Sequence, residues 1–495
     1  MKFISTRGKF TDKVDSAYAI KCGLAADGGL FMPESIPSLS SNELLSLKDK
    51  NYNERAAYII GKFLTDYTYD ELLADAAGAY AGNKFGPHPA PVKNVDGKIY
   101  SLELWHGPTS AFKDMALQIM PRLFVRALRK TGETKDALIL VATSGDTGKA
   151  ALEGYRDIDS VKIQVFYPTD GVSAVQKRQM QTQEGKNVSV KAIRGNFDDA
   201  QSGVKRIFAD EKMAARLTER NTFLSSANSI NWGRLVPQIV YYVSAYLDMV
   251  CSGDISCGEK IDVCVPTGNF GNIFAGYIAK LMGLPIEKFV CASNVNNVLT
   301  DFLKEGTYDK NRSFHATISP SMDILISSNL ERLLFLTAGA EETGKYMEML
   351  SSCGKYTVSG SVFAKISESF IGLFADEART KATICSFYKN KNYLIDTHTA
   401  VAMAAAEEYL STYKAERKIL VVSTASPYKF AKDVYTSLVG EENAPSDIEA
   451  IEKLSALTGT EIPAPLSSVI AKEILHPDVI GKEDMDNAVA DFVTL

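Results

Sequence analysis

Short hydrophobic segments alternate with amphipathic segments along much of this chain of 495 residues. Several hydrophobic segments are rich in β-branched residues and have the length of a buried strand, and each precedes a polar loop and a helical pattern. The predicted strands are residues 137–141, 161–167, 188–193, 261–265 and 419–422. Strand, loop and helix in this order predict an α/β fold, with parallel sheets covered by helices and ligands bound at the loops that follow the strands.

Two other parts of the chain have a different pattern, which predicts separate units. The first 95 residues read as helices and irregular segments, and they end near the Pro-rich stretch GPHPAPV at 86–92. Residues 300–395 contain polar, Ser-rich segments around helical patterns, and we interpret them as an insertion. We therefore predict an N-terminal domain (1–95), followed by the part of the chain that forms the parallel sheets.

The composition is that of a globular protein, with 45% hydrophobic and 23% charged residues. The net charge is −6, and no basic stripe interleaved with aromatic residues is present, which argues against nucleic-acid binding. No run of about eighteen apolar residues predicts a membrane span. The charged start lacks the apolar core of a secretory signal, so we expect a cytoplasmic protein. The seven cysteines and five histidines lack the spacing of a zinc site, so no metal site is predicted.

The segment PTGNFGN, at 266–272, lies between a predicted strand and a strong helical pattern at 273–282 that stops at Gly283. Small residues let backbone N–H groups approach an anion closely, and the start of a helix adds a favourable dipole. A phosphate group is the natural ligand of such a loop. The alternative is an ordinary tight turn between strand and helix.

The segment TSGDTGK, at 143–149, invites comparison with the phosphate loop of nucleoside triphosphatases, GxxxxGK followed by Ser or Thr. Thr143 stands where the first glycine is required, and Ala150 follows the lysine. Because of these two differences we reject a nucleoside triphosphatase. The remaining hydroxyl groups and N–H donors favour a carboxylate or phosphate of a small substrate, and a solvated turn is the alternative.

Two further segments carry candidate chemistry. HGPTSAFKD, at 106–114, places Lys113 behind an aromatic residue in a turn before a predicted helix at 116–128. Such a lysine can form a Schiff base with an aldehyde cofactor, or it can be an exposed lysine paired with Asp114. In STASP, at 423–427, two hydroxyl residues follow a predicted strand. One of them can face a bound ring, or Ser426 can simply cap the next helix.

These segments, taken together, resemble those of the threonine synthase family, pyridoxal-phosphate enzymes of the tryptophan-synthase-β group (fold type II). The resemblance rests on GLAADGGLFMPE (23–34), HGPTSAFKD, TSGDTG, NSINWGR (228–234), GNFGN, SPSMDILISSNLERLLF (319–335), DTHTA (396–400) and STASP, in the expected order. The lysine and GNFGN segments occur loosely across the wider group, whereas the N-terminal block and SSNLERLL are specific to threonine synthases. Three positions depart from the family pattern, where Leu is more usual than Ser110, Ser than Lys149 and Pro than Thr397.

The resemblance implies two parallel-sheet domains with the active site between them, plus a mostly helical N-terminal domain. The large domain (96–135 and 215–495) would bind pyridoxal 5'-phosphate, and the small domain (136–214) would bind substrate. Lys113 would be the catalytic residue and would hold the cofactor as a Schiff base, while Thr424 would bond to the pyridine nitrogen. The implied cofactor-binding residues are Lys113, Gly268, Asn269, Phe270, Gly271, Asn272 and Thr424. The implied substrate-binding residues are Thr143, Ser144, Gly145, Asp146, Thr147, Lys149 and Arg234.

The implied reaction is the conversion of O-phospho-L-homoserine and water to L-threonine and phosphate. Arg234, and less strongly Lys149, would bind the substrate phosphate, because arginine forms bidentate contacts with phosphate oxygens. The alternatives are a phospho-lyase that releases 2-oxobutyrate, ammonia and phosphate, and a regulatory protein that has lost catalysis. A serine or threonine dehydratase or a cysteine synthase would not be expected to carry GLAADGGLFMPE. The expected assembly is a monomer or a homodimer.

Overall fold

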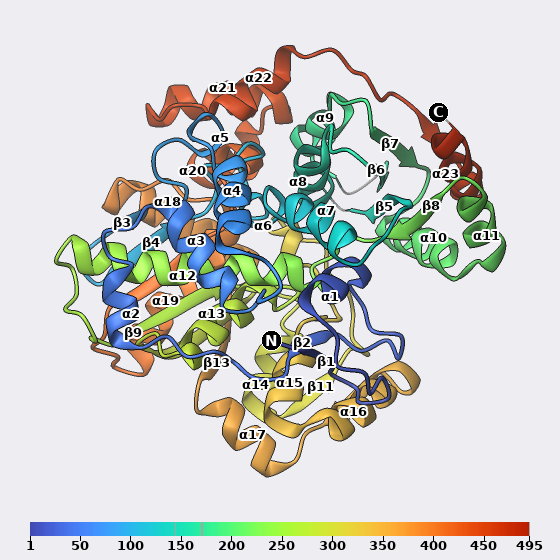
Figure 1. The fold of residues 1–495 in the computed structure, drawn as a ribbon. Helices are drawn as coiled ribbons and strands as arrows, with labels where there is room; N and C mark the ends of the chain where they lie inside the picture. Colours follow the sequence, from blue (N-terminus) through green and yellow to red (C-terminus); the bar gives the residue numbers. More distant parts are fainter. Residues whose placement is uncertain (144, 170–171, 495) are drawn as a thin grey trace.

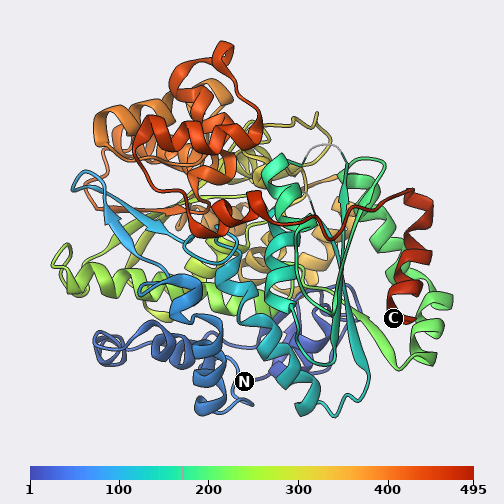
Figure 2. The same ribbon diagram turned by 90° about the horizontal axis from the view of Figure 1, so that it is seen from above.

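The computed structural model describes residues 1–143, 145–169 and 172–494. Two sheets organise it, and they lie on opposite sides of the molecule in Figures 1 and 2. The larger sheet has the strand order β13 (Phe370–Phe374), β10 (Ile286–Ser293), β9 (Ile261–Pro266), β14 (Ile419–Ser423), β4 (Ile99–Glu103) and β3 (Val92–Asn94). The smaller has the order β15 (Val479–Ile480), β7 (Val188–Ile193), β6 (Val161–Pro168), β5 (Asp136–Ala142) and β8 (Thr222–Ser225).

Neighbouring strands are parallel throughout the smaller sheet, and only the edge strand β3 runs antiparallel in the larger one. The predicted strands at 137–141, 161–167, 188–193, 261–265 and 419–422 are confirmed as β5, β6, β7, β9 and β14. The fold is therefore the predicted α/β class, with two helix-covered, mainly parallel sheets. Parallel strands end at the same edge of a sheet, so the loops that follow them meet there.

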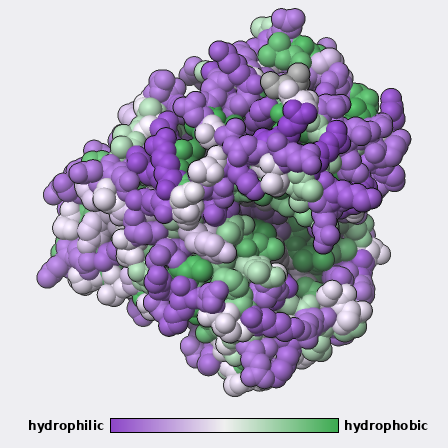
Figure 3. Space-filling view, turned by 45° about the vertical axis from the view of Figure 1, so that its right-hand side comes forward, coloured by the Kyte–Doolittle hydropathy of each residue, from purple (hydrophilic) through white to green (hydrophobic). Residues whose placement is uncertain are grey.

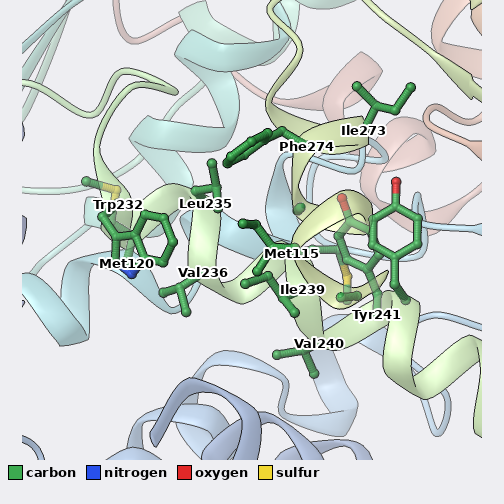
Figure 4. Close-up of a cluster of buried hydrophobic side chains, with 14 of the residues drawn as sticks. Met115, Met120, Trp232, Leu235, Val236, Ile239, Val240, Tyr241, Ile273 and Phe274 are labelled. Atoms are coloured by element: carbon green, nitrogen blue, oxygen red, sulfur yellow. The ribbon is translucent and has the colours of Figure 1, made fainter. Parts of the chain in front are cut away.

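The helices around the larger sheet come from distant parts of the chain. They are α6 (Asp114–Leu117), α7 (Met120–Lys130), α12 (Trp232–Cys251), α13 (Gly271–Met282), α18 (Glu377–Lys391), α19 (Thr397–Thr412), α20 (Ala431–Val439) and α21 (Asp447–Thr458), with short η2 (Pro427–Phe430) and η3 (Glu441–Asn443). Figure 4 shows the apolar core where α6, α12 and α13 pack, with Met115, Val236 and Phe274 among its side chains. This core supports the loops that begin α6 and α13.

The smaller sheet is covered by α8 (Asp146–Tyr155), α9 (Ala174–Gln181), α10 (Phe197–Ala209), α11 (Glu211–Glu219), α22 (Ala464–Ala471), η4 (Lys482–Asp484) and α23 (Met485–Thr494). Figure 1 shows the C-terminal segment, in red, running from α22 across the molecule to α23. Strand β15 lies in this segment and pairs with β7, while β8 pairs with β5. The smaller sheet therefore takes strands from outside the predicted range 136–214.

The N-terminal region consists of the antiparallel pair β1 (Phe3–Ser5) and β2 (Phe31–Pro33) with α1 (Ser16–Cys22), α2 (Ser41–Ser46), α3 (Tyr52–Gly61), α4 (Tyr69–Ala79) and α5 (Gly82–Phe85). The predicted insertion range, 300–395, holds α14 (Val298–Glu305), β11 (Thr307–Asp309), η1 (Pro320–Met322), α15 (Leu330–Ala338), α16 (Ala340–Ser352), β12 (Lys355–Thr357) and α17 (Gly360–Ser367). It also holds β13, the edge of the larger sheet, so this range is not wholly an addition to the sheet.

The single helix predicted at 116–128 is wrong, because the structure has two helices there, α6 and α7, separated at Gln118 and Ile119. Pro121 lies in the first turn of α7 and has no N–H to donate to the carbonyl of Leu117, so a continuous helix would lose a hydrogen bond. In the part of the chain that the structure describes, no helix combines the length and apolar character needed to cross a membrane.

Candidate active site

The lysine loop, residues 106–113, is stabilised by hydrogen bonds to the carboxylate of Asp114. Asp114 begins α6, and its carboxylate accepts hydrogen bonds from the backbone N–H of Thr109 (2.8 Å) and from its hydroxyl (2.7 Å). Lys113 is buried, with 9% of its surface exposed. The alternative of an exposed lysine paired with Asp114 is therefore wrong, since Lys113 is inside and Asp114 is engaged with Thr109.

The lysine loop is joined to the STASP segment by backbone hydrogen bonds. Phe112 N–H donates to the carbonyl of Thr424 (2.8 Å), and Ser426 N–H donates to the carbonyl of Ser110 (3.1 Å). Ser426 also accepts from Tyr428 N–H, so its predicted capping role is confirmed, at η2. Thr424 is buried, and its hydroxyl has no hydrogen-bond partner within residues 1–143, 145–169 and 172–494. A hydroxyl beside the lysine loop is thus free for a ligand.

The GNFGN segment turns sharply from β9 into α13. Phe270 adopts a left-handed conformation (φ 60°) just before the helix begins at Gly271. A Cβ on Gly268 would lie 2.7 Å from the carbonyl oxygen of Ser321, so the backbone approach there requires glycine. The carbonyl of Asn269 accepts from both the N–H and the side-chain amide of Asn329, at 3.0 Å each. The loop therefore ends at the N-terminus of a twelve-residue helix, where the first backbone N–H groups have no partner within the helix.

Asn272 holds an unused donor in this loop. Its Oδ1 accepts from the hydroxyls of Tyr241 and Tyr242, both at 2.6 Å, which fixes the amide orientation. The Nδ2 group is then buried without a partner among the residues that the structure describes. An orphaned buried donor, a glycine-only approach and a helix start all fit a phosphate group. The residues of this loop therefore fit the phosphate group of pyridoxal phosphate.

The TSGDTGK loop is shaped by Thr143, whose hydroxyl accepts from the N–H groups of Gly145 (3.0 Å) and Gly148 (2.9 Å). Ser144, predicted to bind substrate, lies outside the described residues. Thr147 is half-buried in the first turn of α8. Lys149 is turned to other partners, because its ammonium pairs with Glu153 (3.0 Å) and also contacts Gln183.

Asp146 joins several parts of the site. Its carboxylate pairs with Lys429 (2.8 Å) and Lys113 (3.4 Å) and accepts from Gln176 (2.9 Å) and from the hydroxyl of Ser321 (3.2 Å). Burial by itself would raise the pKa of Asp146, but the two ammonium groups and the Gln176 amide hold that pKa well below its usual range. Asp146 is therefore a carboxylate at the centre of the site.

The surroundings of Lys113 favour its neutral form. Burial lowers the pKa of Lys113; the carboxylate of Asp146 opposes this effect, and the positive charges of Lys429 and Arg234 add to it. The ring of Phe112 lies 4.9 Å from the ammonium. A lysine whose pKa is lowered can act as a nucleophile or base near neutral pH.

Arg234, in the first turn of α12, is a buried cation without a carboxylate partner in the described part of the chain. One guanidinium nitrogen donates to the carbonyl of Ala227 (2.8 Å), while Nε is buried with no partner. Burial lowers its pKa to about 10. An unpaired buried guanidinium is a donor set for a phosphate.

Two residues near the site were not predicted from the sequence. Lys429 is fully buried and contacts Asp146, and its position between two aromatic residues in SPYKF was the available signal. His398, in the DTHTA segment, accepts at Nε2 from Ser321 N–H (3.1 Å), so its Nδ1 carries the proton shared with Asp396 (2.8 Å). Only the folded chain brings this histidine to the turn that covers Gly268.

A third unpredicted residue, Arg332, connects the phosphate loop to distant segments. It is fully buried, and its guanidinium donates to the carbonyls of Phe31 (3.1 Å) and Ile230 (2.6 Å) and contacts Asn329, which holds Asn269. The N-terminal region, the start of α12 and the GNFGN loop therefore share one cation. The signal was its presence in the SSNLERLLF segment.

The structure thus brings together Lys113, Asp146, Thr424, Arg234 and the GNFGN loop, and leaves Lys149 paired elsewhere. Ser321 connects two of these parts, since its hydroxyl reaches Asp146 and its carbonyl covers Gly268. Figure 3 shows one face of the molecule hollowed, with hydrophobic residues in the walls of the hollow. A buried lysine, a phosphate cradle and a second cation describe a site for a phosphorylated aldehyde cofactor and an anionic substrate.

Family models agree with this description. The model described as "Pyridoxal-phosphate dependent enzyme" matches residues 87–425. Those described as "Threonine synthase N terminus" and "Threonine synthase, C-terminal" match residues 2–80 and 399–465. Fold and site therefore define a pyridoxal-phosphate-dependent enzyme of fold type II. The chain belongs to the threonine synthase family.

Known proteins support this membership. The chain is 38% identical over 450 residues to the threonine synthase of Pseudomonas aeruginosa, covering 90% of this chain and 92% of that protein. It is 41% identical over 457 residues to "Threonine synthase-like 1" of Homo sapiens, covering 88% of this chain but about 60% of that longer protein. The crystal structure of "PLP bound Threonine synthase from Brucella melitensis" superposes with a TM-score of 0.88 at 35% identity, covering 100% of both chains.

Proposed function

We propose that this chain converts O-phospho-L-homoserine and water to L-threonine and phosphate. The observation that carries the proposal is the pairing of two anion sites around one buried lysine. The GNFGN loop fits the cofactor phosphate, and the unpaired guanidinium of Arg234 supplies a separate site for a substrate phosphate. A substrate without a phosphate would leave this buried cation unsatisfied.

The residues that would hold pyridoxal phosphate come from three loops. Lys113 would bind it covalently, Gly268, Asn269, Phe270, Gly271 and Asn272 would surround its phosphate, and the Thr424 hydroxyl would bond to the ring nitrogen. A hydroxyl partner leaves the ring nitrogen more nearly neutral than an aspartate would, which favours elimination over transamination. When bound, the cofactor supplies an electron sink that acidifies the Cα–H bond of an amino acid.

The substrate would lie between the two sheets. Its carboxylate would meet the loop of Thr143, Ser144, Gly145 and Thr147 at the start of α8, where the helix dipole favours an anion. Asp146 belongs to this loop, but its carboxylate faces Lys113 and Lys429, so it would orient the lysine and not bind the substrate carboxylate. The small domain, 136–214, would thereby be the substrate-binding one and the large domain the cofactor-binding one.

Lys113 would perform the proton transfers. As a free amine Lys113 would be a suitable base, because its surroundings lower its pKa. Its flexible four-carbon stem would let the amine reach all three substrate carbons. It would take protons from Cα and Cβ, and it would return a proton to Cγ after phosphate has left that carbon. Arg234 would hold the departing phosphate, and closure of the two sheets would exclude water until it is needed at Cβ.

Product analysis tests the proposal. The purified chain, supplied with pyridoxal phosphate, is incubated with O-phospho-L-homoserine and the products are resolved by NMR. L-Threonine with phosphate is the expected result. Release of 2-oxobutyrate, ammonia and phosphate would instead assign a phospho-lyase on the same scaffold. Absence of any phosphate release by cofactor-loaded protein would overturn both and favour a regulatory protein.

A further inference from the structure

Lys429 is a second lysine in the candidate active site, and it is fully buried in η2, just after the STASP segment. Its ammonium donates to the carboxylate of Asp146 (2.8 Å) and to the carbonyl of Thr109 (2.9 Å). A buried ammonium persists only when paired and hydrogen-bonded. Lys429 meets that condition with partners on the lysine loop and on α8.

Asp146 lies between two lysines, and this creates a charge imbalance. Within the part of the chain that the structure describes, Asp146 is the carboxylate that forms an ion pair with either Lys113 or Lys429. Its other partners, Gln176 and Ser321, are neutral. Asp114 is a second buried carboxyl group that interacts electrostatically with Lys429, but its oxygens accept hydrogen bonds from Thr109 and form no ion pair with either lysine within the described residues. Two buried ammonium groups would therefore share one directly paired carboxylate, which burial disfavours.

The contact distances decide which lysine bears the charge. Lys429 lies 0.6 Å closer to Asp146 than Lys113 does (2.8 Å against 3.4 Å), and it has a second acceptor at Thr109. Lys113 is also buried, but its contact with Asp146 is the longer one, so its ammonium is held less tightly. The positive charge of Arg234 also disfavours the ammonium form of Lys113.

We propose that Lys429 is the permanent counter-cation of Asp146 and thereby leaves Lys113 as the neutral amine that attaches the cofactor. Lys429 is a positioning residue in this role, because it acts through Asp146. The inference rests on the proposed role of Lys113. It differs from a purely structural role, in which Lys429 only ties Thr109 to α8, by predicting a change in the pH dependence of Lys113.

The test measures cofactor attachment against pH. Cofactor-free full-length protein is mixed with pyridoxal phosphate, and the visible absorbance of the attached cofactor is followed across pH. The titration of the free cofactor is common to all variants, so differences between midpoints report Lys113. Lys429→Met leaves Asp146 to stabilise the ammonium of Lys113, so its midpoint is expected to rise by about one pH unit or more. Lys429→Arg keeps the charge and is expected to stay near the wild-type midpoint.

Asp146→Asn is expected to shift the pH midpoint of cofactor attachment in the opposite direction. It leaves two cations facing each other, so the midpoint is expected to fall, and the double variant with Lys429→Met is expected to lie between the two single variants. General damage to the site would reduce the final absorbance of both variants without moving their midpoints in opposite directions. If Lys429→Met does not fold, as judged by circular dichroism, Lys429→Gln removes the charge while keeping a donor for Thr109.

Two failures are distinguishable. An unchanged midpoint in the folded neutral variants at position 429 overturns the counter-cation role, provided that Lys113→Ala abolishes the attached-cofactor absorbance. Persistence of that absorbance in Lys113→Ala would instead overturn the proposed function itself.

Discussion

The backbone N–H of Phe112 donates a 2.8 Å hydrogen bond to the carbonyl of Thr424. This bond, with the one from Ser426 N–H to the carbonyl of Ser110, pairs the lysine loop with the segment that follows β14. The spacing between Lys113 and the Thr424 hydroxyl is therefore set by main-chain bonds. Side-chain substitutions in these two loops should change chemistry more than geometry.

Lys113→Ala is expected to abolish both turnover and the visible absorbance of attached cofactor, lowering activity by about a thousandfold or more. Lys113→Arg keeps a cation near Asp146 but cannot form the covalent bond, so it is expected to behave like the alanine variant. Absorbance spectra and phosphate release check both. Lys9→Ala, at an exposed ion pair, serves as the control and should match wild type. Retained activity in Lys113→Ala would contradict the assignment.

Arg234→Met is expected to lower kcat/KM for O-phospho-L-homoserine by about a hundredfold, because a charge-assisted phosphate contact is lost. Inorganic phosphate should inhibit the wild type competitively and inhibit the variant much less. The Tm of the cofactor-free protein should be unchanged or higher, since the guanidinium is buried without a carboxylate partner. Unchanged inhibition by phosphate in Arg234→Met would rule out this residue as the phosphate site.

Gly268→Ala is expected to weaken cofactor binding by about tenfold or more, because the new methyl group would lie 2.7 Å from the carbonyl of Ser321 and force the phosphate loop to shift. Titration with pyridoxal phosphate measures the change. Gly360→Ala, where nothing lies within 4 Å of an added Cβ, is the matched control and should bind normally. Equal affinities in the two variants would show that the loop tolerates the methyl group.

His398→Gln and His398→Asn separate the two contacts of this histidine. A glutamine oxygen can replace Nε2 as the acceptor for Ser321 N–H, whereas an asparagine reaches only as far as the Nδ1 contact with Asp396. We expect the glutamine variant to retain most activity and the asparagine variant to lose about tenfold in kcat, because the turn over Gly268 loosens. Steady-state kinetics measure kcat for both variants, and a lower kcat in the glutamine variant than in the asparagine variant would contradict this expectation.

Asp114 predicts a pH dependence of stability. Burial raises its pKa to about 6, although the hydrogen bonds from Thr109 oppose the shift. The folded protein therefore holds this proton more tightly than the unfolded chain. The resulting stabilisation is fully present below the ordinary pKa of 3.8 and is lost as pH rises through about 6, a change of about 2–3 kcal/mol.

Asp114→Asn keeps an acceptor for Thr109 N–H and removes the titration. The difference in Tm between Asp114→Asn and the wild-type protein should therefore increase from pH 4.5 to pH 7. At pH 7 the difference should be about a few degrees for a chain of this size. Scans of the cofactor-free proteins measure this difference, and Asp114→Ala, which loses both hydrogen bonds, is expected to be destabilised at every pH. Parallel profiles for wild type and Asp114→Asn would contradict the assigned pKa.

Much of the secondary structure could be predicted from the sequence, but the break between α6 and α7 and the strand β13 could not. The strands β5, β6, β7, β9 and β14 were predicted because buried parallel strands are short, continuous and β-branched. The hydrophobic pattern does not reveal the break between α6 and α7, because apolar positions continue across Pro121 while the proline removes a backbone donor. The edge strand β13 was not predicted, because its five residues lie between polar segments and are too few to show a clear alternation of polar and apolar positions.

The chain by itself determined the α/β class and the order of the loops, because strand and helix patterns depend on residues that are close together in sequence. It offered Lys113 and the GNFGN loop only as candidates, which the resemblance to a family then favoured over their alternatives. Tertiary structure alone decided that Lys149 is paired with Glu153, that Arg234 has no carboxylate partner, and that Lys429 and His398 join the site. Whether a charge is paired depends on which distant segments meet, and burial then sets its energy. No local pattern contains that information.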